Sequence, residues 1–512
     1  MRHRDIRLAF LLLALTATVN CGAQTGLSIE DRSSTYLESV RHDPVLLREF
    51  LYGMPKGGDL HNHLEGSVYA ESFVRFASGD GLCANRRTYT LTAPPCAPAA
   101  ERFLVSKRLL EDFALKEAMI DAYSMRNWAP GSDSAHEHFF QSFSKFSEAA
   151  KRHTADMMAE VIARAGEEHL QYLEIMCTPD GGRAIKLGSD LPWNNDFAKT
   201  KELLTAGISI LVQSTRKSLD DAENQVQTQL KCGTPRAARG CGVSTRYIYQ
   251  VLRGFAPNQV FAQMLLAFQL AEMDSRVVGV NLVMPEDWYV PLKDFDLHMK
   301  MLAYLHELHP KVHIALHAGE LWSGLVAPEE LRFHIRKSIE KGAAERIGHG
   351  TSVMFEDHPI ELLKEMAAKK ILVEICLTSN DLILGVRGVS HPLPLYLKYG
   401  VPAALATDDQ GVSRSDITAE YVRATQAYLL TYRQLKQFAR ESLEHSFLSG
   451  VSLWADLQLT STVPACASDR RGASSPSDSC RSILDKSARA RLQWKLESEF
   501  EDFEQTVSSR VP

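Results

Sequence analysis

Apolar and polar residues follow two different periods along this chain. Short, mostly apolar runs, typical of buried strands, are separated by longer stretches in which apolar residues recur at helical spacing. A first short strand carries His61 and His63, and further strands are expected at 170–176, 246–252, 277–283, 312–317, 346–350, 371–377 and 401–407. Eight units of strand followed by helix predict an α/β fold, a closed parallel (β/α)8 barrel of the TIM type. An open doubly wound sheet is the alternative, but no glycine-rich nucleotide fingerprint supports it.

Helical segments fill the gaps between these strands and extend the chain at both ends. The pattern predicts helices near 195–215, 257–273, 292–309, 328–341, 359–369 and 393–399. The expected organisation is a helical extension at 24–53, a barrel at 54–450, and a C-terminal part at 451–512 whose loop and helix (482–503) pack on the barrel. Residues 78–99 are rich in Gly, Pro and Cys and are expected to form a loop.

The first residues have the layout of a secretory signal. Arg2, Arg4 and Arg7 precede an apolar run at 8–19, and small residues follow it. We expect a signal peptide at 1–23 and export to a periplasmic or extracellular location; the run is too short for a membrane span. Attachment to lipid through Cys21 is the alternative, although Asn20 is a poor residue in front of an acylated cysteine.

The cysteines support an oxidising compartment. Six of the nine form close pairs that enclose short loop-like segments, which predicts the disulfides Cys83–Cys96, Cys232–Cys241 and Cys466–Cys480. Cys177 and Cys376 lie in or at the end of apolar runs and are expected to be buried thiols. Zinc-finger pairing is the competing interpretation, but the chain contains no Cys-x-x-Cys.

Composition excludes some partners. The formal net charge is −6, with 45% hydrophobic and 23% charged residues, which is ordinary for a globular protein. No basic stretch is long enough to predict binding of nucleic acid or of an anionic membrane. A small molecule is therefore the expected partner, and a homodimer remains possible.

Polar side chains that suit a metal site follow several of the predicted strands. They are His61, His63, His317, Glu320, His349, Asp408 and Asp409. Active sites of parallel barrels lie at the carboxyl ends of the strands, so we expect these side chains to converge. Three imidazoles and one carboxylate suit zinc with an open position for water, which makes His61, His63, His317 and Asp408 the predicted ligands.

The remaining groups suit proton transfer and substrate binding. His349 could orient the water or take its proton, and Glu320 could donate a proton to the substrate. Asp409 is expected to point away from Asp408, because neighbouring strand residues face opposite sides, and so to bind substrate. The fourth strand has no lysine that could bridge two metals, so one ion per chain is expected. A cytidine-deaminase type of zinc site is excluded, since Pro-Cys-x-x-Cys is absent.

Several of these stretches together resemble the adenosine deaminase family of the amidohydrolase superfamily. They are Met-Pro-Lys-Gly-Gly-Asp-Leu-His-Asn-His at 54–63, His-Ala-Gly-Glu at 317–320, Arg-Ile-Gly-His-Gly at 346–350, Glu-Ile-Cys-Leu-Thr-Ser-Asn at 374–380 and Ala-Thr-Asp-Asp at 406–409. The first of them, with the secretory segment, is most similar to the secreted, growth-factor-related branch.

The resemblance implies metal-dependent deamination of adenosine or 2′-deoxyadenosine at C6 of the purine. It implies that Glu320 protonates N1, that His349 orients and deprotonates the water, and that Asp409 contacts N7. The catalytic residues are then Glu320, His349 and the ligand Asp408.

Two positions depart from that pattern. Met284 stands where the family often has a glycine whose backbone meets N3, and it could reshape the pocket. Glu65 stands where many adenosine deaminases have an aspartate that meets the ribose, and a glutamate there is similar to adenine deaminases. Deamination of adenine or of an N6-substituted purine is thus one alternative, and a catalytically silent purine-binding protein is another.

Overall fold

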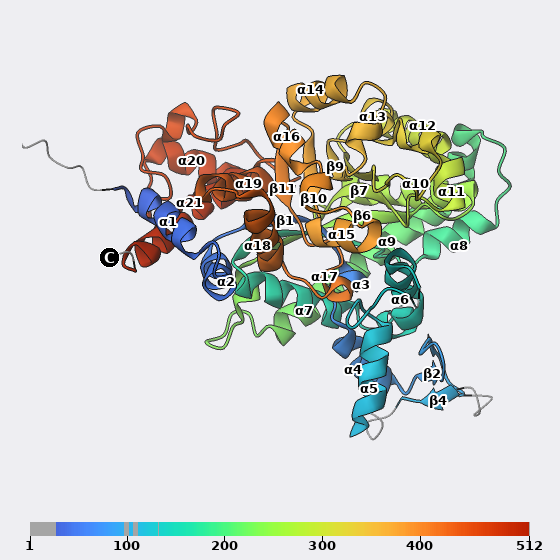
Figure 1. The fold of residues 1–512 in the computed structure, drawn as a ribbon. Coiled ribbons are helices and arrows are strands. Elements are labelled where there is room, and N and C mark those ends of the chain that lie inside the picture. The colour runs from blue at the N-terminus through green and yellow to red at the C-terminus, as the bar shows by residue number, and fades with distance from the viewer. Residues whose placement is uncertain (1–26, 97–101, 106–110, 132, 511–512) are drawn as a thin grey trace, which may run out of the picture.

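Eight parallel strands form the centre of the molecule (Figure 1). The computed structural model describes residues 27–96, 102–105, 111–131 and 133–510, so the predicted signal peptide and Cys21 lie outside the described residues. The strands follow one another in the sheet in chain order: β1 (Gly57–His63), β5 (Leu170–Cys177), β6 (Ser244–Leu252), β7 (Val277–Val283), β8 (His313–Ala318), β9 (Arg346–His349), β10 (Leu372–Ile375) and β11 (Ala403–Leu405).

The last strand returns to the first and nearly closes the sheet. The Asp408 amide donates to the His61 carbonyl at 2.8 Å, and the His63 amide donates to the Asp408 carbonyl at 3.2 Å. Below this bridge the Thr407 hydroxyl donates to the carboxylate of Asp59 at 2.5 Å. The predicted (β/α)8 barrel is therefore confirmed, and its closure places β1 and the end of β11 side by side.

Helices surround the barrel (Figure 1). Those between and beside its strands are α3 (Leu64–Ser67), α4 (Ala70–Asp80), α5 (Phe113–Ala122), α6 (Ala135–Ala150), α7 (Thr154–Glu167), α8 (Arg183–Ser189), α9 (Phe197–Gln229), α10 (Pro257–Met273), α11 (Tyr289–Lys293), α12 (Phe295–Leu308), α13 (His334–Glu340), α14 (Pro359–Lys369), α15 (Leu377–Leu384), α16 (Leu393–Tyr399), α17 (Gln410–Ser413), α18 (Ile417–Tyr428) and α19 (Tyr432–Glu444).

The burial of two of these helices follows their sequence patterns. α10 is apolar almost all round, and most of it is buried between its neighbours. α9 is amphipathic: it buries Leu204, Ile208 and Val212 but leaves Ile210 exposed. Both helices therefore take the positions that their hydrophobic periodicity predicts.

The predicted N-terminal helical extension consists of two helices. They are α1 (Ile29–Val40) and α2 (Pro44–Gly53). The chain breaks between them because the Asp43 carboxylate accepts hydrogen bonds from the Val45 and Leu46 amides, while Pro44 occupies the first helical position. α1 packs on the C-terminal helix α21 (Ala488–Ser508), so the two ends of the described chain lie together (Figure 1).

The predicted loop at 78–99 is wrong in part. β2 (Cys83–Asn85) pairs antiparallel with β3 (Leu91–Thr92) and with β4 (Arg102–Leu104), giving a small sheet that protrudes beside α4 and α5 (Figure 1). The Asn85 side chain accepts hydrogen bonds from the Arg87 and Thr88 amides and so turns the hairpin. Strands of two or three residues are too short to produce a recognisable alternation.

Three predicted helices are each divided in the structure. Residues 292–309 belong to α11 and α12, which separate at Asp294, and 328–341 contain a 3-10 turn (Pro328–Leu331) before α13. At the C-terminus, α20 (Asp478–Lys486) ends before Ser487, whose hydroxyl caps α21 by accepting from the Ala490 amide. A capping side chain sets only the last of these boundaries, since α12 and α13 begin without one, and hydrophobic periodicity alone does not locate any of the three.

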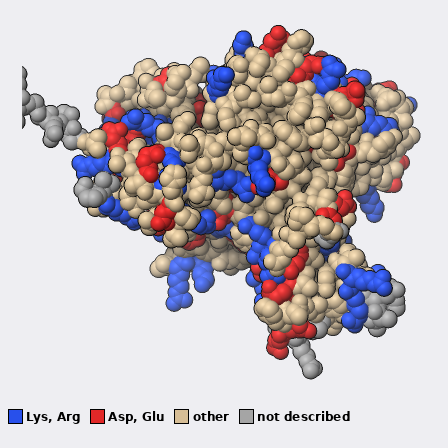
Figure 2. Space-filling model, in the orientation of Figure 1, with Lys and Arg blue, Asp and Glu red and all other residues tan. Residues whose placement is uncertain are grey.

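The predicted disulfides are confirmed, and Cys177 and Cys376 are buried free thiols. Acidic and basic side chains are interspersed over the face seen in Figure 2. None of the helices in the described ranges is long and apolar enough to cross a membrane.

Candidate active site

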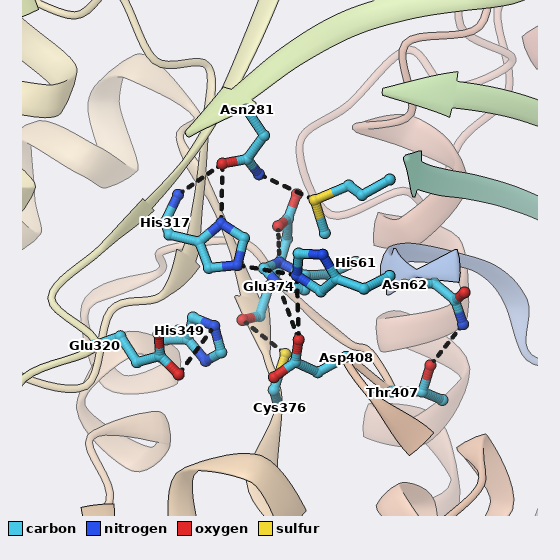
Figure 3. A network of polar contacts seen from close by, with 12 residues as sticks. His61, Asn62, Asn281, His317, Glu320, His349, Glu374, Cys376, Thr407 and Asp408 are labelled. Atoms are coloured by element: carbon cyan, nitrogen blue, oxygen red, sulfur yellow. Dashed lines mark hydrogen bonds and ion pairs between the residues drawn. The ribbon is translucent and has the colours of Figure 1, made fainter. Parts of the chain in front are cut away.

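Side chains from four strand ends meet at the carboxyl end of the barrel (Figure 3). Ligand atoms of His61, His317, His349 and Asp408 all lie within 4.8 Å of one another, and all four residues are buried. His63 joins them, since its Nε2 lies 3.1 Å from Nε2 of His317 and 3.4 Å from Oδ1 of Asp408. The structure thus brings together the predicted ligands His61, His63, His317 and Asp408, with His349 beside them.

The far side of each ligand ring is held by a hydrogen-bond acceptor. His61 Nδ1 lies 2.6 Å from the carboxylate of Glu374, so this nitrogen must carry the proton. Oδ1 of Asn281 accepts from the His317 backbone amide at 3.1 Å, which fixes it as the oxygen, and it therefore also accepts from His317 Nδ1 at 2.9 Å. His63 Nδ1 lies 3.0 Å from Oε1 of Gln250.

These contacts engage Nδ1 of each ring, so Nε2 is the nitrogen that each ring can offer to a metal at the centre of the group. His61 Nε2 is buried, yet no hydrogen-bond partner for it occurs in the part of the chain that the structure describes. An orphaned buried imidazole nitrogen is costly unless something binds it. This observation, together with the nitrogen and oxygen donor set, fits a metal ion.

The electrostatics also favour a cation here. Burial lowers the pKa of His61, but the carboxylates of Asp408 and Glu374 outweigh burial and raise it to about 10. Burial and the neighbouring His61 hold the pKa of His317 well below its usual value. Burial opposes ionisation of Asp408, but the contact of its Oδ1 with His61 Nε2 at 3.4 Å and the surrounding imidazoles hold its pKa below the usual range. The group therefore suits one positive charge shared by several ligands.

An unusual backbone conformation orients the side chains of Asp408 and His349. Asp408 has φ +56° and His349 has φ +65°, both in the left-handed region that non-glycine residues rarely adopt. The expectation that Asp408 and Asp409 point apart as strand neighbours is wrong, because β11 already ends at Leu405. Carboxylate atoms of Asp408 and Asp409 lie within 4.8 Å of each other and of His63.

Glu320 is positioned by a second carboxylate. Glu286 accepts hydrogen bonds from the Gly319 amide at 3.2 Å and from the Glu320 amide at 2.8 Å, and His334 contacts it at 2.5 Å. The turn directs the Glu320 carboxylate into the site, 3.6 Å from His349 Nε2. Burial raises the pKa of Glu320 well above its usual value, and repulsion from Asp408 and Glu286 adds to this effect. Such a carboxyl group is suited to hold a proton and to donate it.

A cavity of about 920 Å³ opens beside this group and includes Glu65, Asp409, Glu320 and Met284 in its lining. Asp409 is buried and its Oδ1 has no hydrogen-bond partner among the described residues. Gly66 makes this position possible, because a Cβ there would lie 1.6 Å from Asp409 Oδ1. Glu65 is half-buried, and burial raises its pKa. Burial and repulsion from Asp408 raise the pKa of Asp409 well above its usual value, so the cavity contains an unpaired carboxyl group that can hold a proton next to the candidate metal site.

Met284 keeps a glycine-like backbone with φ +85°. Its sulfur accepts a hydrogen bond from the Gly254 amide at 3.3 Å, and a Cβ on Gly254 would lie 2.7 Å from the Met284 methyl carbon. The side chain is thus turned toward Gly254, which limits how far it narrows the cavity.

Sequence reasoning missed the residues that hold the ligands. Glu374, Asn281, Gln250 and Glu286 had no assigned role. A polar residue inside an apolar strand, such as Asn281 in β7, is a signal that could have identified one of them. Glu286 gives no such signal, because it lies in a loop.

Taken together, fold and site define a parallel barrel with a buried histidine and aspartate group that suits a metal. A family model described as adenosine deaminase matches residues 132–452. The chain belongs to the adenosine deaminase family.

Curated relatives match a shorter segment. Adenosine deaminases of Escherichia coli, among them those of strains SMS-3-5 and SE11, are 39% identical over 138 residues. The match covers 27% of this chain and 38% of the relative, so the chain spans well under half the length of these relatives.

Solved structures agree in fold. A Burkholderia ambifaria amidohydrolase with bound Zn has a TM-score of 0.54 at 17% identity, covering 95% of this chain and 97% of the other. An adenine deaminase from Arthrobacter aurescens has a TM-score of 0.51 at 18% identity (77% and 94%). Arabidopsis ADAL in complex with IMP also has a TM-score of 0.51, at 20% identity (78% and 94%). At such identities the likeness concerns the fold alone.

Proposed function

We propose that the protein is a zinc-dependent deaminase that hydrolyses adenosine or 2′-deoxyadenosine to inosine or 2′-deoxyinosine and ammonia. One observation supports this above the others: the convergence of His61, His63, His317 and Asp408 beside Glu320, in a chain of this family. All of these groups except His61 line one cavity.

His61, His63, His317 and Asp408 would hold one zinc ion, and nitrogen and oxygen ligands of this kind suit zinc best among the common metals. When bound, the ion would lower the pKa of a water molecule and so supply a nucleophile at neutral pH. His349 lies beside the ligands and orients the attacking water. Glu320 donates a proton to ring nitrogen N1 as the water oxygen bonds to C6. One proton of the water then passes to the amine, which leaves C6 as ammonia, and the other returns to Glu320.

A nucleoside suits the cavity better than a free base does. The cavity has a volume of about 920 Å³, which lies near the upper end of the volumes of ordinary ligand sites and exceeds the volume that one purine ring system fills. Asp409 supplies an unpaired buried carboxyl group whose raised pKa lets it hold a proton and donate it to N7 of the purine. Glu65 lies within the same cavity and faces the remainder of the substrate.

Deamination of adenine or of an N6-substituted purine is the second candidate. Glu65 favours it, because a longer acidic side chain at that position leaves less room for a ribose. An adenine deaminase and ADAL with IMP both share the fold. A silent purine-binding protein is disfavoured, because the proton donor and the predicted ligands are all present.

An assay of deaminase activity on a set of purines identifies the substrate. The zinc-loaded full chain is incubated with adenosine, 2′-deoxyadenosine, adenine, AMP and N6-methyladenosine, and the ultraviolet absorbance of the purine is followed. Turnover of the two nucleosides is expected, and turnover of adenine alone would favour the second candidate. If none of these compounds is turned over, the proposed function is wrong.

One substitution separates chemistry from binding. Glu320→Gln keeps the shape of the side chain but removes the proton, so kcat should fall by about 10²- to 10⁴-fold with zinc content unchanged. Glu361→Gln, on an exposed helix position, is the control and should keep full activity. Full activity of Glu320→Gln would contradict its assigned role.

Export is a further part of the proposal. Disulfides at three places are consistent with an extracellular protein. We infer a signal peptide at 1–23, which the mass of the mature N-terminus of secreted protein would test; a mass that includes an acyl group on Cys21 would favour the lipid anchor. Dimerisation and the division into an extension, a barrel and a C-terminal part stay predictions.

A further inference from the structure

His349 differs from the other histidines of the site in the atom that contacts its Nδ1. Its Nδ1 lies 3.0 Å from the Nδ2 amide nitrogen of Asn380, whereas an oxygen contacts the corresponding nitrogen of each predicted ligand. Its Nε2 points into the site, 3.6 Å from Oε1 of Glu320, and is buried without a hydrogen-bond partner in the described ranges. Which nitrogen of His349 carries the proton therefore decides what it offers to the site.

The position of the His349 proton follows from a chain of hydrogen bonds that starts at the backbone amide of Leu393. The Leu393 amide donates to Nδ1 of His391 at 3.1 Å. A backbone amide nitrogen can only donate, so Nδ1 of His391 must be the acceptor. Burial lowers the pKa of His391 to about 3, so its ring is neutral and its single proton is on Nε2.

That proton fixes the orientation of Asn380. His391 Nε2 lies 3.0 Å from Oδ1 of Asn380, and a nitrogen that carries a proton requires an oxygen opposite it. The amide group of Asn380 must then face His349 and donate to its Nδ1. An imidazole that accepts at Nδ1 is neutral there and carries its proton on Nε2. Asn380 is fully buried and His391 nearly so, which shields the chain of bonds from competing water.

This is the opposite tautomer to that of the predicted ligands. His61 and His317 donate from Nδ1 to Glu374 and to Asn281, so each presents a lone pair at Nε2. His349 presents an N–H at the same place. Distances alone allow His349 to be grouped with His61, His317 and Asp408 around a cation, but its one lone pair is already used by Asn380.

We propose that His391 and Asn380 are positioning residues that lock His349 in the Nε2–H tautomer, so that His349 serves as a hydrogen-bond donor and not as a metal ligand. Its role in catalysis rests on the proposed deamination: His349 donates its Nε2–H to the oxygen of the attacking water and orients it, and takes no proton from it. The tautomer itself does not depend on which reaction the protein performs.

The tautomer is directly observable. The full chain, labelled with ¹⁵N in its histidine rings and loaded with zinc, is studied by long-range ¹H–¹⁵N correlation spectroscopy, and the His349 signals are those missing from His349→Gln. A proton on Nε2 of His349, with protons on Nδ1 of His61 and His317 as internal references, is expected. A proton on Nδ1 of His349 would overturn the proposal even if the protein is an active deaminase.

Asn380→Asp makes the same test by substitution. A carboxylate can only accept, so the proton of His349 should move to Nδ1. In the spectrum, Nδ1 should then give the signal of a protonated nitrogen and Nε2 that of an unprotonated one. An unchanged tautomer in this variant would show that Asn380 does not control it. The result holds whether or not any purine is turned over.

His391 is tested by two variants of similar size. In His391→Leu the Asn380 amide is free to turn, so kcat should fall about tenfold with KM within about twofold and zinc retained. In His391→Gln an amide N–H can replace the lost donor, and most of kcat should return. A role in packing alone predicts equal kcat for the two variants, and that result would contradict the proposal.

Discussion

Two groups of buried charges lie in the barrel interior and differ in how completely their hydrogen bonds are made. In the lower group, Arg346 donates to Glu374 at 2.7 Å and to Glu174 at 2.5 Å, and Glu174 also accepts from the Tyr172 hydroxyl and the Phe447 amide. Each carboxylate oxygen of Glu174 and Glu374 has a partner.

The upper group, at the strand ends, is left open. His61 Nε2, His349 Nε2 and Asp409 Oδ1 are buried, and the described residues supply no hydrogen-bond partner for any of them. Buried polar atoms are normally paired, so open ones mark positions where another molecule or ion completes the bonds. The two groups should therefore have different roles. The paired group should stabilise the fold, and the open group should bind the metal and the substrate. Glu374 belongs to both, because it links Arg346 to His61.

The largest expected effect is on activity, in the open group. Asp408→Asn removes the only carboxylate among the predicted ligands, so the protein should lose most of its zinc and more than about 10³-fold in kcat/KM. Zinc content and turnover are measured on the same preparation. An active variant with full zinc content would show that Asp408 is not a ligand.

Arg346→Met tests the paired group. It leaves two buried carboxylates without their cation, which should lower the free energy of unfolding by about 3–5 kcal/mol. Arg433→Met is the matched control, because Arg433 forms its ion pairs with Glu30 and Asp31 at the surface and should contribute less than about 1 kcal/mol. Denaturation of the metal-free full chain measures both, and equal losses would show that the paired group stabilises the fold no more than a surface ion pair does.

Glu374→Gln tests the residue shared by both groups. The amide no longer holds the His61 proton as a carboxylate does, so zinc affinity should fall about 10- to 100-fold. Competition with a chelator of known affinity measures this change. An unchanged affinity would show that Glu374 acts on folding alone.

The smallest expected effect concerns the fit of substrate. Gly66→Ala would place a Cβ 1.6 Å from Asp409 Oδ1 and displace that carboxylate, so KM should rise about tenfold with zinc retained. Gly79→Ala, another helical glycine with nothing within 4 Å of its added Cβ, is the control. The two variants should differ in KM; if they do not, Asp409 has no part in binding substrate.

The sequence was sufficient to predict the barrel and the residues that meet at its rim. Eight apolar runs at regular spacing predict the parallel sheet, and polar residues at strand ends must meet when such a sheet closes. The disulfide pairs were predictable for a different reason, since each closes a short loop.

The supporting residues were not predictable in the same way. Whether Asn380 turns its oxygen or its nitrogen toward His349 depends on His391, eleven residues further on, and on the Leu393 amide. Periodicity also misled at Asp408 and Asp409, because alternation holds only inside a strand and β11 ends before them. Geometry beyond regular elements depends on backbone conformations such as φ +56° at Asp408.

The central claim is that the open atoms at the strand ends hold one zinc ion. Crystals of the zinc-loaded protein, measured with X-rays at the zinc absorption edge, would locate the ion by its anomalous scattering. We predict a single peak about 2.0–2.2 Å from Nε2 of His61, His63 and His317 and from a carboxylate oxygen of Asp408, with His349 Nε2 outside this shell. Absence of a peak there, or a peak coordinated by His349, would contradict the account.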